Sequence, residues 1–155
     1  MASREVVYAA QNYCDRTTAA DPITNPDAYY AAQDDEIAIL MNTDPDDSSA
    51  LLEKLYKALA DPFLPQRYRA EYSIRRADFE GGQTATLIRA AKVALEGVRN
   101  SNRLKGYPED HDETFLTQMA MLIEIVEACA AGDKSKEDGL EKKFDRIVTH
   151  TKKRR

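Results

Sequence analysis

Apolar residues recur every three or four positions along most of the chain, which is the spacing of one face of an α-helix. The pattern is clearest from about residue 84 to 104, where five apolar residues fall within about 100° of one another on a helical wheel. These are Leu87, Ala91, Ala94, Leu95 and Val98. The residues from about 111 to 131 form the most hydrophobic stretch, so we expect them to be the central helix.

Start and stop signals divide the remaining chain into further helices. Asn25-Pro26-Asp27 is typical of a helix start, and Asp61-Pro62 is typical of an end. Asp110 with Glu113 fits an acidic capping box, and Ser135 fits the start of a last helix. Besides the two helices above, we expect helices at about 3–20, 26–41, 49–60, 66–80 and from 135 onward.

The residues from 66 to 80 fit two structures. Tyr68, Tyr72 and their apolar neighbours alternate with charged residues, which is a strand pattern. The same residues follow Pro65 and precede Gly81-Gly82, which are helix start and stop signals. A lone strand among helices has no partner to pair with, so we favour a helix here.

Six or seven helices joined by short turns predict an all-α fold, a single-domain bundle whose core draws on every segment. The length of 155 residues suits one domain. We expect this domain to cover residues 1–151 and a basic tail to cover residues 152–155.

Composition narrows the class of protein. Hydrophobic residues make up 43% and charged residues 32% of the chain, which is typical of a globular protein with a charged exterior. No apolar run approaches the ~20 residues of a membrane span, and the N-terminus lacks the apolar core of a secretory signal. Cys14 and Cys129 fall on apolar faces, so we expect buried structural thiols. We therefore predict an intracellular protein without a membrane role, cytoplasmic or directed to the nucleus by its basic tail.

Motifs for catalysis are missing from the sequence. We find no phosphate-binding glycine loop, no zinc-protease helix and no nucleophile elbow. His111 lies in an acidic turn and His150 near the C-terminus, and neither belongs to a recognisable catalytic or metal-binding pattern. The acidic clusters 34–36 and 44–47 do not match a calcium-binding loop. We expect no enzyme activity, no cofactor and no metal. An enzyme whose active site lacks a known motif is the third hypothesis, after the two given below.

Charge is distributed in blocks. The net charge of −5 is the sum of −8 over residues 1–50, +5 over 51–105, −7 over 106–133 and +5 over 134–155. Two interpretations fit this pattern. In the first, oppositely charged surfaces meet within one fold or simply coexist in solvent. In the second, separate acidic and basic faces favour head-to-tail self-association, or binding of a polyanion to one face.

The basic residues suggest where a polyanion would bind. Four cations of the helix at 84–104 fall within about 80° on the helical wheel and cover about 21 Å along its axis. We call them the α-helical stripe: Arg89, Lys92, Arg99 and Arg103. Four arginines precede this helix, interleaved with Tyr68 and Tyr72 as candidate stacking platforms. They are Arg67, Arg69, Arg75 and Arg76.

Two functions follow from these charges. The first is a non-enzymatic protein that self-associates as a homo-oligomer and contacts the backbone of RNA or another single-stranded nucleic acid through the eight cations. The second is a protein–protein adaptor or inhibitor without a nucleic-acid role. Its acidic surface would bind a basic partner through Asp34, Asp35, Glu36, Asp44, Asp46 and Asp47.

Overall fold

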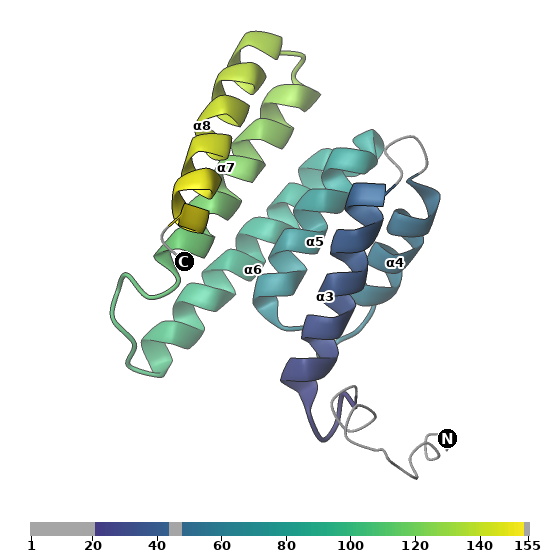
Figure 1. Cartoon of the computed structure of the whole chain (residues 1–155), viewed down its shortest axis with the longest axis vertical. Helices are drawn as coiled ribbons and strands as arrows, with labels where there is room; N and C mark the ends of the chain where they lie inside the picture. The colour runs from purple at the N-terminus through teal and green to yellow at the C-terminus, as the bar shows by residue number, and fades with distance from the viewer. Residues whose placement is uncertain (1–20, 44–47, 154–155) are drawn as a thin grey trace. The chain divides into compact units, whose positions relative to one another are not determined.

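The computed structural model describes residues 21–43 and 48–153, with the backbone alone for residues 43 and 147–153. These residues form six α-helices and one short 3-10 helix, and none of them is in a β-strand (Figure 1). The helices are α3 (Pro26–Thr43), α4 (Ser49–Leu59), α5 (Gln66–Phe79), α6 (Thr84–Leu104), α7 (Glu113–Ala130) and α8 (Lys134–Lys153). The 3-10 helix η1 covers Gly81–Gln83. The all-α prediction is confirmed.

The segment that was ambiguous in the sequence is helical. In α5, Ala70, Ser73, Ile74 and Ala77 lie at helical spacing and are all buried. A strand would have placed Ser73 and Ile74 on opposite faces, whereas the helix buries both. The prediction of a helix is therefore correct.

Helix ends agree with the sequence at some points and differ at others. The Asn25 side chain accepts a hydrogen bond from the Ala28 N–H at 3.4 Å, which caps α3 as expected. Gly132 follows α7 with a φ of +74°, a conformation that suits glycine. The expected cap at Ser135 is wrong, because the Asp133 side chain accepts the Lys136 N–H at 3.1 Å instead.

The core forms where α5, α6 and α7 pack together. The predicted apolar face of α6 is buried, together with Ile88. It packs against Ala70, Ile74 and Ala77 of α5, and against Met119, Ile123 and Val126 of α7. Figure 1 shows α5 beside α6, and α7 followed by the antiparallel α8. The apolar face of α6 is thus held by the core, which fixes the direction of the charged residues that flank it.

The chain divides into two compact units, Met1–Lys54 and Leu55–Arg155, and the boundary falls within α4. In the first unit, Lys54 Nζ lies 2.7 Å from Glu36 Oε2 and joins α4 to α3. Tyr30 and Ile37 of α3 are buried, and Leu40 and Met41 are half-buried. The single domain over residues 1–151 stays a prediction. The expected helix at 3–20 with Cys14, the acids 44–47, His150 and the tail end 154–155 lie outside the described residues or side chains.

Candidate nucleic-acid interface

The α-helical stripe lies on the outer side of α6. Four cations of α6 are exposed, and their backbone positions are fixed because the adjoining apolar face of α6 is part of the core: Arg89, Lys92, Arg99 and Arg103. The α6 helix spans Thr84–Leu104 without interruption, so the four cations stand on one continuous rod. The expectation that they project outward from one helix agrees with this geometry.

Carboxylates of the same chain interrupt the stripe. Lys92 Nζ lies 3.5 Å from Glu127 Oε2, and Arg99 Nη1 lies 3.2 Å from Glu96 Oε2. These four side chains are between 46% and 58% exposed, and ion pairs of that exposure contribute about 0–1 kcal/mol. A phosphate competes with such pairs at little cost. The Arg89 side chain forms no hydrogen bond or ion pair with any other residue in the described part of the chain.

Arg69 and Arg76 were predicted to assist the stripe, but their guanidinium groups bind to other residues of the second unit. Arg69 donates to the backbone oxygens of Leu59 at 3.1 Å and Asp61 at 2.6 Å, which belong to the last residue of α4 and to the turn after it. Arg76 pairs with Glu80 at 2.5 Å and covers the ring of Tyr56 at 3.9 Å. Both guanidinium groups already satisfy acceptors of their own chain, so their geometry favours a structural role.

Arg67 and Arg75 have looser internal contacts. Arg67 lies 3.6 Å from Asp112 and 4.4 Å from the centre of the Phe115 ring, yet its side chain is 49% exposed. Arg75 lies 3.9 Å from Glu71 on the same helix and is 25% exposed. Their part in phosphate binding stays a prediction, and Arg67 retains more access to solvent than Arg75.

The two tyrosines expected to stack on bases differ in access. Tyr72 is 1% exposed, so its ring is unable to offer a face to a base and the expectation is wrong for this residue. Tyr68 is half-buried, with its ring stacked 5.9 Å from that of Tyr72. Residues at i and i+4 lie on the same side of a helix, so the two rings contact each other and Tyr72 is covered.

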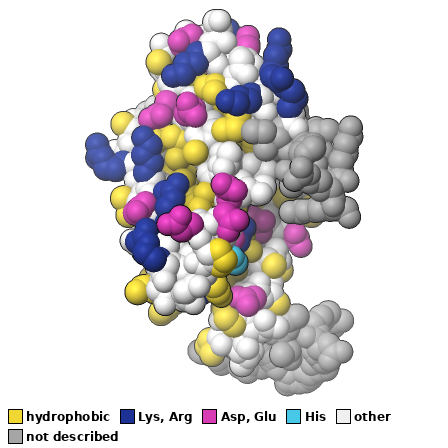
Figure 2. All heavy atoms as spheres, turned by 90° about the vertical axis from the view of Figure 1, so that its left-hand side faces the viewer, with side chains coloured by type: hydrophobic (Ala, Val, Ile, Leu, Met, Phe, Trp, Pro, Cys, Tyr) yellow, Lys and Arg dark blue, Asp and Glu magenta, His cyan; other side chains and the backbone are white. Residues whose placement is uncertain are grey.

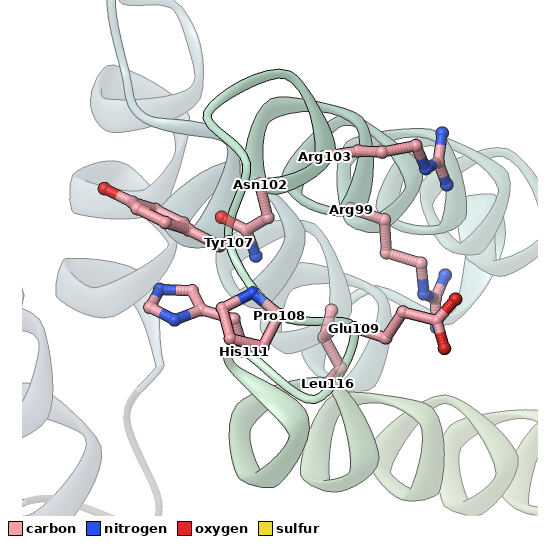
Figure 3. Close-up of a pocket in the computed structure, with 8 residues that line it drawn as sticks. All are labelled: Arg99, Asn102, Arg103, Tyr107, Pro108, Glu109, His111 and Leu116. Carbon is pink, nitrogen blue, oxygen red and sulfur yellow. The ribbon is translucent and has the colours of Figure 1, made fainter.

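A hollow of about 330 Å³ lies where the turn between α6 and α7 folds back on the end of α6. The lining residues combine cationic, aromatic and acidic side chains: Arg99, Asn102, Arg103, Tyr107, Pro108, Glu109, His111 and Leu116. Figure 3 shows Tyr107 and His111 on one side of this group, and Arg99, Arg103 and Glu109 on the other. Half of the α-helical stripe therefore borders a concave surface that the sequence did not indicate.

Asp112 holds this turn in place. Its φ of +62° is in the left-handed region, where aspartate is tolerated better than most residues. Asn102 Nδ2 donates to Asp112 Oδ2 at 3.0 Å, and Arg67 lies on the other carboxylate oxygen. Asp112 is the N-cap of α7 without a capping hydrogen bond from its side chain, so the expected box of Asp110 with Glu113 is wrong. The Asp112 side chain instead holds the turn against α5 and α6, through Arg67 and Asn102.

The other half of the stripe borders a second, more open hollow of about 560 Å³ between α6 and α7. Arg89 and Lys92 line it together with Glu127 and small apolar side chains such as Ala130. The two hollows lie at opposite ends of α6. The stripe is thus two pairs of cations, each beside a concave surface and each near a carboxylate.

Acidic and basic side chains are interspersed over the face shown in Figure 2. Blocks of charge in the sequence therefore do not become uniform blocks on this surface. Of the predicted acidic surface, Asp34 is half-buried, Asp35 and Glu36 are exposed, and Glu36 pairs with Lys54.

The described residues hold few other candidates for chemistry. Cys129 is exposed, so the expected buried thiol is wrong. The Glu137 carboxylate raises the pKa of the Cys129 thiol, which keeps the sulfur protonated and weakly nucleophilic at neutral pH. No three potential metal ligands gather in the part of the chain that the structure describes. Over the same part, no helix combines the length and hydrophobicity that a bilayer crossing requires.

Replacing Glu80 by glutamine should reduce the loss of stability that the protein shows as the pH falls. The Tyr56 hydroxyl, at 2.6 Å, and Arg76 both donate to the Glu80 carboxylate, and they lower its pKa. A carboxyl whose pKa falls on folding stabilises the protein at neutral pH, and this contribution disappears as the pH drops through the folded-state pKa. Melting temperatures of wild type and Glu80→Gln between neutral pH and about pH 3 should converge towards the acid end; parallel curves would contradict the role given to Glu80.

The chain matches no protein-family model, no curated protein and no solved structure. Any functional conclusion therefore rests on the geometry above.

Proposed function

We propose that this chain is a non-enzymatic helical protein that contacts the backbone of RNA or another single-stranded nucleic acid through the α-helical stripe. The observation that carries the proposal is the placement of four exposed cations along one rigid helix. They cover about 21 Å, a length over which a single strand presents several phosphates. Self-association belongs to the same proposal and rests on the alternating charge blocks of the sequence alone, since acidic and basic side chains are interspersed on the face in Figure 2.

The net charge of −5 does not oppose a local interface. Phosphate binding depends on the potential near the strand, because charges more than about 10 Å away are screened at ordinary salt concentrations. The carboxylates nearest the stripe, Glu96 and Glu127, are exposed and already face cations. We therefore expect moderate affinity and a strong dependence on salt.

The test is a fluorescence-anisotropy titration with a labelled single-stranded RNA of about 12 nucleotides. Four phosphate contacts give a slope of about −2.8 for the logarithm of affinity against the logarithm of salt concentration. Affinity should fall about 50-fold between about 50 and about 200 mM salt. Replacing Arg89, Lys92, Arg99 and Arg103 together by glutamine should abolish the salt-dependent part.

A matched variant separates the stripe from general charge. Lys136, Lys142, Lys143 and Arg146 are exposed cations of α8, and their replacement by glutamine removes the same charge. We expect this variant to keep most of the affinity. Equal losses in both variants would mean diffuse attraction rather than a stripe, and no binding at the lower salt would reject the proposal in favour of the protein–protein adaptor.

A further inference from the structure

We propose that the hollow at the turn between α6 and α7 holds one nucleotide of the bound strand, with its base against Tyr107 and its phosphate at Arg99 and Arg103. This inference rests on the proposed function and adds to it the kind of strand that binds. Every residue of the hollow comes from the segment 99–116, so the site is complete within the second unit.

The aromatic side of the hollow suits a base. The ring of Tyr107 lies 4.2 Å from the imidazole of His111 at an angle of 36°, and Tyr107 remains 43% exposed. Pro108 and Leu116 add apolar surface to the same lining. An exposed ring beside apolar side chains stacks on a base of any sequence, because every base has a π-face. Tyr107 thus offers what the buried Tyr72 is unable to provide.

The cationic side suits a phosphate. Arg99 and Arg103 are one helical turn apart on α6, and both line the hollow. Arg103 Nη1 lies 2.6 Å from the Asn100 side-chain oxygen, an exposed neutral contact, and Arg99 Nη1 lies 3.2 Å from the exposed Glu96 carboxylate. Both guanidinium groups can turn to a phosphate and bind it through two N–H groups.

Figure 3 shows the rings of Tyr107 and His111 on one side of Asn102 and Pro108, and the guanidinium groups of Arg99 and Arg103 on the other. The proposed nucleotide therefore lies across Asn102 and Pro108, with its base at the aromatic side and its phosphate at the cationic side of the hollow. The volume of about 330 Å³ is at the lower end of the ~300–1,000 Å³ of ligand pockets, which is room for one nucleotide. Glu109 lies on the cationic side in Figure 3 and repels a phosphate there. The site therefore contains an acidic side chain whose removal should strengthen binding.

A base inside a duplex is stacked and paired, so it reaches Tyr107 only after it leaves the helix. The site therefore favours single strands. We expect a single-stranded RNA of about 12 nucleotides to bind about tenfold more tightly than a duplex of the same length at low salt. The Tyr107→Ala variant should lose this preference, and Tyr107→Phe should keep it.

Two further variants sharpen the test. Phe63 is 83% exposed and outside the hollow, so Phe63→Ala is the matched control for loss of an exposed ring and should bind like wild type. Glu109→Gln should bind the single strand more tightly, by about two- to fivefold for one screened charge. Circular dichroism of each variant checks that the helices are intact.

The outcomes separate the two proposals. If single strand and duplex bind equally and Tyr107→Ala behaves like Phe63→Ala, the nucleotide site is rejected while salt-dependent binding by the stripe stands. If no oligonucleotide binds at low salt, both proposals are rejected. A nucleoside monophosphate is the third arm of the titration: binding as tight as that of the strand would make the hollow a site for free nucleotides and would overturn its assignment to a strand.

Discussion

Ile74→Ala should lower the free energy of unfolding by about 2–5 kcal/mol, the range measured when a buried isoleucine becomes alanine. Ile74 is 1% exposed and belongs to the cluster that joins α5, α6 and α7. The removed atoms leave a cavity that the backbones of three helices are unable to fill, since each is held by further buried side chains. Urea unfolding followed by circular dichroism measures the loss.

Two controls bracket this result. Ile74→Val removes a single methylene and should cost about 0.5–1.5 kcal/mol. Val93→Ala shortens a side chain of α6 that is 67% exposed and should change stability by less than about 0.5 kcal/mol. If Ile74→Ala costs no more than Val93→Ala, then Ile74 does not lie at the centre of the core.

Arg69→Ala should destabilise the second unit by about 2–4 kcal/mol, because hydrogen bonds from a charged donor contribute about 1.5–3 kcal/mol each. Its guanidinium group donates to the backbone oxygens of Leu59 and Asp61, and the Asp61 oxygen also accepts the Leu64 N–H at 3.2 Å. Leu59 is the last residue of α4, where backbone oxygens lack partners within the helix. Thermal and urea unfolding measure the effect.

Arg69→Lys keeps the charge but loses the planar fork that reaches two oxygens, so we expect it to restore only part of the stability. Arg103→Ala removes an arginine from an exposed position and should leave stability nearly unchanged. An Arg69→Ala variant that is as stable as wild type would contradict the structural role of Arg69 and would leave its guanidinium group available to a phosphate.

Much of the fold could be predicted because helical periodicity and stop signals are local. The apolar face of α6 was identified correctly from spacing alone, and so was the helix over 66–79 once the lack of a strand partner was considered. Helix caps were harder to predict. Asp133 caps α8 in place of Ser135 because either residue suits a cap in sequence and only the backbone path decides between them.

The candidate site could be predicted only in part. The exposure of the stripe followed from the helical wheel, since its residues flank the apolar face and do not belong to it. The internal roles of Arg69 and Arg76 depend on how α4 and the turn after it pack against α5, which helical periodicity does not predict. Tyr107 and Leu116 are brought to one hollow by the left-handed Asp112, a backbone feature without a sequence signature of its own.

The turn at Asp112 links mutational tolerance at three distant positions. Its left-handed backbone costs about 1 kcal/mol for a residue other than glycine, and the contacts with Asn102 and Arg67 offset this cost. Because the Asp112 side chain contacts both of the others, replacing any one of the three reduces the contribution of the other two to stability. In a library of variants selected for folding, Arg67, Asn102 and Asp112 should accordingly be retained or replaced as a group, and glycine should be the favoured substitute at 112 once its neighbours have changed.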